Sequence, residues 1–177
     1  MDETDSTFRA RLGTTWAPPV GHPPQLRRVS KRREISSMVA LVAPSKRGRA
    51  RLYARHFEGS VHGAQAVTAL RYFHRKVGRP LVVVWDRLGV HRSQEVKNFV
   101  EAHSEDFVLE EFPAYAPELN PEEGCNSQVK LSMLNATPES VADLHRQVRA
   151  AFVRLGRRHT ALRGFFGHAG LSLRGLT

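Results

Sequence analysis

The sequence predicts an α/β layer fold with a mixed β-sheet, flanking helices and a helical C-terminal part. Three observations support this prediction. Two apolar runs follow each other in the first third, helical and strand patterns alternate in the middle, and only helical periodicity continues after residue 120. With 177 residues the chain can bury one core but is short for two, so we expect residues 1–177 to form a single domain. The expected order of elements is β-β-α-β-α-β-α-α.

The first expected elements are two antiparallel strands and a helix. Residues 35–43 and 51–59 are apolar or alternating runs, and the loop between them contains a glycine, as in a β-hairpin. Residues 62–77 have apolar side chains at spacings of three and four, which is typical of an amphipathic helix: Ala66, Leu70, Phe73 and Val77. Gly78 and Pro80 then end this helix.

The middle and end of the chain predict two further strands and several helices. Residues 80–86 are a continuous β-branched run ending in an acid, as a buried central strand does, and residues 107–112 form another strand. Between them, Ser93 can cap a helix whose apolar face carries Val96, Phe99 and Val100. Later helices are expected at 121–134, from 137 onward and near 160–168. The longest has one apolar stripe, formed by Leu144, Val148, Ala151, Phe152 and Leu155.

The first thirty residues are rich in proline, glycine and cations, which predicts an extended or hairpin-like lead-in anchored by Trp16.

The whole chain has 27 Lys and Arg against 17 Asp and Glu, a net charge of +10, which favours a polyanionic partner such as nucleic acid. The single Cys125 excludes an internal disulfide and a cysteine-based zinc site, and indicates a reducing cytoplasm. No stretch has the length and apolar character of a membrane span, so we expect a soluble protein.

Two acids follow expected strands. In open α/β sheets, functional groups gather at the carboxyl ends of strands. Asp86 lies at such an end, and Glu123 opens the helix after the 107–112 strand, so a neighbouring strand order would bring both carboxylates together. Converging carboxylates bind Mg²⁺, and a pair of such ions can promote displacement at phosphorus. A structural interpretation fits equally: Asn120, Pro121 and Glu123 are also an ordinary capped helix start, and Asp86 is also an ordinary turn residue.

Together these motifs resemble the catalytic domain of the DDE transposases of insertion sequences, the IS630/Tc1/mariner superfamily. The strand-end motif is VVVWDRLGVHRS and the loop-helix motif is FPAYAPELNPEEGCNSQVK, while DET, TTWAPPVGHPP and LRGFFGHAGL extend the likeness over nearly the whole chain. The resemblance implies an RNase H-like fold and metal-dependent cleavage and strand transfer of DNA. It further implies Mg²⁺ or Mn²⁺ in a two-metal site and transposon ends and target DNA as partners. The implied assembly is a homodimer, located in the bacterial cytoplasm at the nucleoid.

Carried over by position, the resemblance implies that the catalytic and metal-binding acids are Asp2, Asp86 and Glu123, with about 36 residues between the last two. His91 matches a histidine common in the motif, which would contact the scissile phosphate, orient Asp86 or simply lie in the turn. Lys130 would reach a DNA phosphate or remain a solvated surface residue. Tyr115 and Asn120 are expected to shape the loop. The densest basic run is a second candidate for phosphate contact, or else a solvated loop: Arg27, Arg28, Lys31, Arg32 and Arg33.

The sequence departs from the family pattern in three ways. Asp2 directly follows Met1, so we expect the first central strand to be truncated and Asp2 to be poorly held at a frayed terminus. The chain contains no helix-turn-helix DNA-binding module. Family members usually have an apolar residue at position 122 and a tryptophan at 126, whereas this chain has Glu122 and Asn126, which predicts looser packing and a competing metal ligand.

Three functions are therefore compatible with the sequence. The first is an active DNA-cleaving and strand-transferring domain. The second is a catalytically inactive remnant that binds DNA or pairs with an intact transposase. An unrelated RNase H-like nuclease is the third, and the loop motif favours it least.

Overall fold

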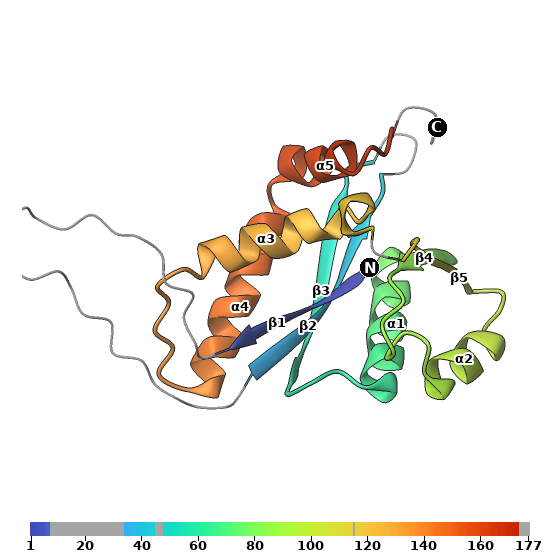
Figure 1. The fold of residues 1–177 in the computed structure, drawn as a ribbon, viewed down its shortest axis with the longest axis horizontal. Helices are drawn as coiled ribbons and strands as arrows, with labels where there is room; N and C mark the ends of the chain where they lie inside the picture. Colours follow the sequence, from blue (N-terminus) through green and yellow to red (C-terminus); the bar gives the residue numbers. More distant parts are fainter. Residues whose placement is uncertain (8–33, 45–47, 115, 174–177) are drawn as a thin grey trace, which may run out of the picture.

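The computed structural model describes residues 1–7, 34–44, 48–114 and 116–173. Figure 1 shows three strands near the centre and two at the right, with helices on both sides of the central strands. The strands are β1 (Asp2–Thr7), β2 (Glu34–Val42), β3 (Arg51–Glu58), β4 (Leu81–Trp85) and β5 (Phe107–Glu111). The helices are α1 (Gly63–Val77), α2 (Gln94–Glu101), α3 (Glu122–Ser132), α4 (Val141–Gly156) and α5 (His159–His168), with a short 3-10 helix at Pro117–Leu119. All the elements predicted from residue 35 onward are present.

Strand β1 is the element that the sequence pattern did not predict. Its residues, DETDST, are polar and show no apolar alternation. They form a strand because β2 pairs with them antiparallel, from Asp2 opposite Val39 to Thr7 opposite Glu34. The expected lead-in from Trp16 to the basic run of residues 27–33 lies outside the described residues, as does Tyr115.

The central strand is β2, which pairs antiparallel with β1 on one side and with β3 on the other. Its side chains alternate between two cores, as the two-residue period of a strand requires. Ile35 and Val39 belong to the core formed with α3, α4 and α5, whereas Met38 and Ala40 belong to the core formed with α1, α2, β4 and β5. The apolar stripe predicted for α4 is buried in the first of these cores.

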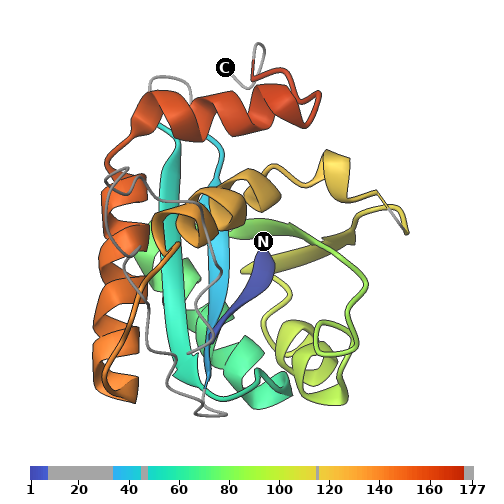
Figure 2. The same ribbon diagram turned by 60° about the vertical axis from the view of Figure 1, so that its left-hand side comes forward.

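The prediction that residues 80–86 form a buried central strand was wrong about burial. β4 pairs in parallel with β5, but Val82 is 69% exposed and Val84 is 36% exposed. The sheet is divided into a three-stranded antiparallel part and a two-stranded parallel part. The two parts meet where the Met1 nitrogen donates to the carbonyl oxygen of Val84 at 2.7 Å, and Figure 2 shows this end of β1 beside β4.

An apolar groove of about 540 Å³ separates the two parts of the sheet beyond Met1. Residues 40–42 of β2 line one side of it and residues 81–84 of β4 line the other, with Phe73 and Phe166 contributing from α1 and α5. β1 pairs with β2 only as far as Val39, and β4 has its described partner strand on its other side. The groove is therefore flanked by the edges of β2 and β4, in line with β1.

Local signals set some of the helix ends. Gly78 ends α1 with a positive φ of 73°, which glycine adopts without steric cost. Ser140 caps α4 by accepting a hydrogen bond from the Asp143 N–H at 3.1 Å. Ser93 precedes α2 as predicted, but its hydroxyl makes no capping hydrogen bond.

Candidate active site

Asp2, the first candidate acid, begins β1 and is only 4% exposed. Its Oδ2 accepts hydrogen bonds from Asn120 Nδ2 at 3.2 Å and from Asn126 Nδ2 at 3.3 Å. Its Oδ1 accepts the backbone N–H of Glu3 at 2.8 Å. The expectation of a poorly held carboxylate was therefore wrong, because pairing with β2 and two amides from the α3 region fix Asp2.

Asp86, the second candidate acid, directly follows β4. Its Oδ1 accepts hydrogen bonds from His91 Nδ1 at 2.8 Å and from the N–H of Leu88 at 3.2 Å, and its side chain is 40% exposed. The His91 ring stacks on Trp85, with centroids 4.3 Å apart and planes 4° from parallel. The pKa of His91 is lowered chiefly by burial, against the opposing effect of Asp86, so we infer a neutral ring that donates from Nδ1. Of the roles considered for His91, the contact that orients Asp86 is present.

Glu123, the third candidate acid, lies in the first turn of α3, and its side chain is exposed. Asn120 prepares this turn: its Oδ1 accepts the N–H of Glu122 at 3.2 Å, and its backbone oxygen accepts the N–H of Glu123 at 3.1 Å. The capping role predicted for Asn120 is thus present, although the helix begins at Glu122. The same side chain donates to Asp2, so one residue links the positions of the first and third acids.

The three acids influence one another electrostatically. The pKa of Asp2 is raised to about 6, first by burial and further by the charges of Glu123 and Asp86, while the N–H of Glu3 opposes the change. Three carboxylates with this mutual repulsion are oxygen donors of the kind that a hard divalent cation binds, so these residues fit Mg²⁺ or Mn²⁺. Within the described ranges, no group of three or more His, Cys, Asp or Glu side chains already has a metal-binding arrangement. Asp2 and Asp86 are instead hydrogen bonded to neighbouring protein groups.

Glu122 and Asn126 belong to this site in a way that sequence reasoning missed. Each is 1% exposed, and Asn126 Nδ2 donates to Glu122 Oε2 at 3.1 Å as well as to Asp2. The pKa of Glu122 is raised well above its usual value, first by burial and then by the charge of Asp2, so the structure favours the protonated carboxyl. Glu122 and Asn126 are four residues apart, which places both on one face of α3. This spacing was the feature of the sequence from which their contact could have been predicted. The predicted loose packing at position 126 is a buried polar cluster instead.

Of the remaining residues predicted to contact DNA, only Lys130 lies among those that the structure describes. Lys130 is partly buried in the last turn of α3, seven residues after Glu123. Its contact with a phosphate stays a prediction. The basic run Arg27, Arg28, Lys31, Arg32 and Arg33 lies outside the described residues. Among the described helices, none has the length and apolar character required to cross a membrane.

Comparison with protein families gives a match to the DDE superfamily endonucleases over residues 1–145. This chain belongs to that family. The membership of the DDE superfamily, expected from the two acidic motifs, is confirmed. No curated protein matches the sequence.

Solved structures similar to this domain include complexes of the Mos1 mariner transposase. The Mos1 paired end complex with Mn has a TM-score of 0.67 at 15% identity, over 95% of this chain and 51% of that one. The Mos1 strand transfer complex has a TM-score of 0.66 at 15% identity, over 96% and 50%. The complex with the left transposon end has a TM-score of 0.57 at 14% identity, over 92% and 53%. The DDE domain therefore has the RNase H-like fold that was expected, and it spans about half the length of these relatives.

Proposed function

We propose that this DDE domain is the catalytic domain of a transposase that cleaves and transfers DNA strands with Mg²⁺ or Mn²⁺ held by Asp2, Asp86 and Glu123. The observation that carries the proposal is the set of hydrogen bonds that join the three segments carrying the acids. Asn120 donates to Asp2 Oδ2 at 3.2 Å and accepts the N–H of Glu122 in the turn that carries Glu123. The Met1 nitrogen, next to Asp2, donates to the carbonyl oxygen of Val84, two residues before Asp86.

In this proposal the protein's own residues bind the metal ions and orient the carboxylates that hold them. A bound pair of metal ions would supply an activated water and stabilise the leaving oxygen at phosphorus. Asn120 and Asn126 hold the Asp2 carboxylate, and His91 holds the Asp86 carboxylate through Nδ1. Asn120 also fixes the helical turn that carries Glu123. Fixed ligands lower the cost of assembling a metal site, so these amides and the imidazole act as positioning residues.

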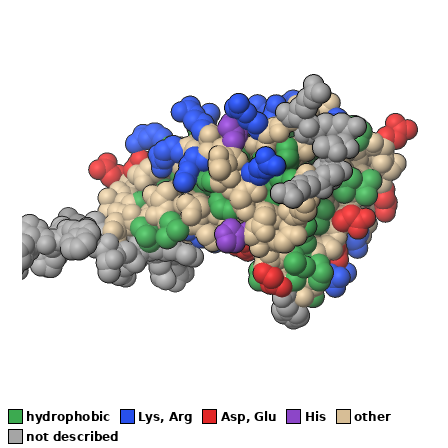
Figure 3. All heavy atoms as spheres, turned by 90° about the horizontal axis from the view of Figure 1, so that it is seen from above, with side chains coloured by type: hydrophobic (Ala, Val, Ile, Leu, Met, Phe, Trp, Pro, Cys, Tyr) green, Lys and Arg blue, Asp and Glu red, His purple; other side chains and the backbone are tan. Residues whose placement is uncertain are grey.

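DNA is the partner that the charge of the chain supports. The net charge of +10 favours a polyanion, and on the face shown in Figure 3 Lys and Arg side chains gather in one region while acidic side chains lie mostly toward the ends. The Mos1 complexes contain transposon ends and, in one case, Mn. By analogy we propose transposon ends and target DNA as the ligands, and two paired copies of the protein as the assembly.

The test is a Mn²⁺ titration followed by thermal unfolding and by nicking of plasmid DNA. We compare wild type with Asp86→Asn and Glu123→Gln, and with Glu118→Gln as the matched control, because Glu118 is exposed and lies five positions before Glu123. Wild type and Glu118→Gln should be stabilised by Mn²⁺ and nick DNA. Both site variants should lose the stabilisation and the nicking.

The opposite result would support the second function considered above. If folded wild-type protein shows no Mn²⁺-dependent rise in its melting temperature and no nicking, the metal proposal is wrong for this chain. The chain would then be an inactive domain whose remaining activity is DNA binding.

A further inference from the structure

A second groove lies along β3, at the edge of the three-stranded sheet that is opposite β1 and Asp2. It has a volume of about 600 Å³ and follows β3, with α1 on one side and α4 on the other. β3 pairs with β2 along its inner edge, and no strand from the described part of the chain pairs with its outer edge. Because β2 separates β3 from β1, this groove is distinct from the three acids of the proposed active site.

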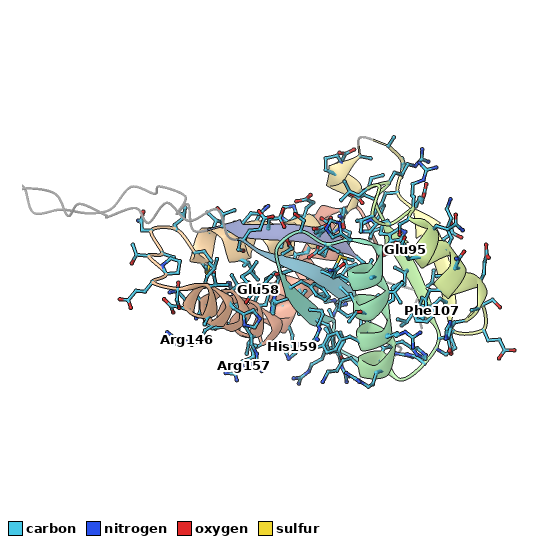
Figure 4. All side chains as sticks on the ribbon, turned by 90° about the horizontal axis from the view of Figure 1, so that it is seen from below. Glu58, Glu95, Phe107, Arg146, Arg157 and His159 are labelled. Carbon is cyan, nitrogen blue, oxygen red and sulfur yellow. The ribbon has the colours of Figure 1, made fainter. Side chains whose placement is uncertain are left out.

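The groove is strongly basic. Four cations line it, and the lining contains no acidic residue: Arg55 of β3, Lys76 of α1, Arg149 of α4 and Arg157 directly after α4. Within the described residues, none of these four forms an ion pair, although acid partners are found for Arg87, Arg92 and Arg146. All four side chains are exposed, and Figure 4 shows Arg157 extending outward from α4. Their charge is therefore available to a ligand.

Aromatic rings and histidines form the walls between these cations. The Tyr72 ring has the Arg55 guanidinium carbon 5.9 Å and the Lys76 Nζ 5.7 Å from its centroid, which holds both cations at the groove. The rings of His56 and His145 lie 5.5 Å apart. The pKa of His56 is lowered to about 4, chiefly by burial and then by the charges of His145, Arg149 and Arg55, which are those of a positive groove wall.

The spacing of the cations fits a phosphodiester backbone. Arg149 lies in α4 and Arg157 is the residue that directly follows this helix, eight positions later, so the two are about 12 Å apart along the helix axis. That distance corresponds to roughly three or four nucleotides, because one strand of duplex DNA carries a phosphate about every 3.4 Å along its axis. Three of the four cations are arginines, whose planar fork matches phosphate oxygens better than the point charge of lysine.

We propose that this basic groove binds the phosphodiester backbone of DNA at a site separate from the three acids. The proposal does not depend on catalysis, because backbone binding needs neither the acids nor a metal. The domain would then have two separate surfaces that contact DNA, one at the three acids and one along the outer edge of β3.

The experiment measures duplex DNA binding by fluorescence anisotropy in EDTA, over about 0.05 to 0.2 M salt. The groove variant carries Arg55→Ala, Arg149→Ala and Arg157→Ala. The control variant carries Arg75→Ala, Lys97→Ala and Arg163→Ala, three exposed cations outside the groove with the same total charge change. We expect the groove variant to bind about tenfold or more weakly, with a salt slope lower by about two to three, and the control to change less than about threefold.

One further protein makes the result decisive. A variant with lysine at the three groove positions keeps the charge, so it should bind within about threefold of wild type and shows that weaker binding by the alanine variant is not misfolding. Because the assay contains EDTA, its result does not depend on a metal held by the acids, which separates this proposal from the proposed catalytic function. Equal losses in the groove and control variants would overturn the proposal. So would equally strong competition by a polyglutamate peptide of matched charge, which would assign the groove to acidic proteins.

Discussion

Asn126 Nδ2 lies 3.3 Å from Asp2 Oδ2, so a side chain of α3 holds the first acid of β1 in place. The same amide donates to Glu122 Oε2 at 3.1 Å, and all three residues are buried. The stability of this region and the position of the proposed metal ligand therefore depend on one polar side chain.

Replacing Asn126 with alanine should affect both properties. The Asn126→Ala change removes a donor shared by two buried carboxyl groups, so the free energy of unfolding should fall by about 1–3 kcal/mol. The loss of a positioning contact should also weaken Mn²⁺ binding by about tenfold or more. Thermal unfolding with and without Mn²⁺ measures both effects, with the exposed Ser127→Ala as the control. Unchanged stability would show that the amide contributes nothing.

Glu122 should make the protein less stable as pH rises. The folded-state pKa of Glu122 is raised above the usual 4.5, so its favourable contribution is complete below that pH and is lost as pH rises through the folded value. Asp2, with a pKa of about 6, acts in the same direction. Glu122→Gln keeps the shape and cannot ionise. It should match wild type near pH 4.5 and exceed its stability by about 1–3 kcal/mol at pH 8.

Urea unfolding from pH 4.5 to 8 measures this difference. Comparison at each pH cancels other titrating groups such as His56, whose lowered pKa costs stability as the pH falls. Exposed Glu118→Gln is the control and should follow wild type throughout. A constant difference between Glu122→Gln and wild type at all pH values would contradict the raised pKa.

Two substitutions of His91 separate its hydrogen bond from its stacking. His91→Asn keeps a donor near Nδ1 for Asp86 but loses the ring on Trp85, so it should cost about 1–3 kcal/mol of stability and leave Mn²⁺ affinity within about threefold. His91→Phe keeps the ring and loses the donor, so Mn²⁺ affinity should fall about tenfold or more. Equal Mn²⁺ affinity in His91→Phe and wild type would remove His91 as a positioning residue.

Gly124 permits the close approach of α3 to α5. A Cβ atom at this position would lie 2.9 Å from Cγ of the Phe165 ring, which is too close without a shift of the ring. Gly124→Ala should therefore lower the free energy of unfolding by about 1–3 kcal/mol, despite the better helix propensity of alanine. In Phe165→Leu the same substitution should cost less, because the smaller side chain leaves room. Additive effects in this double-mutant cycle would exclude the contact.

The apolar groove between β2 and β4 should accept an added strand. A fusion of four alternating β-branched and aromatic residues before Met1 would continue β1 between two open strand edges. We expect its melting temperature to rise by about 5 °C or more, because apolar side chains and backbone groups become paired. A glycine- and serine-rich extension of the same length is the control. An equal melting temperature for both extensions would show that the groove does not take a strand.

The sequence by itself determined most of the secondary structure and the family of the domain. Alternation identified β2 and β3, three-and-four spacing identified α1 and α4, and the motifs around Asp86 and Glu123 identified the family. These signals are local, because burial on one side of an element imposes its own period on the sequence. They also included Asn120, which caps the start of α3 as its residue type predicts.

Only the tertiary structure decided which strand is central, how Asp2 is held and what Glu122 does. β1 has a polar sequence and becomes a strand by pairing with β2, whereas the apolar β4 is left with exposed valines beside an open strand position. Asn126 and Asn120 reach Asp2 across more than a hundred residues of sequence, and no local pattern records such contacts. The pKa of Glu122 follows from burial, a property of the assembled layers and not of its neighbours in the chain.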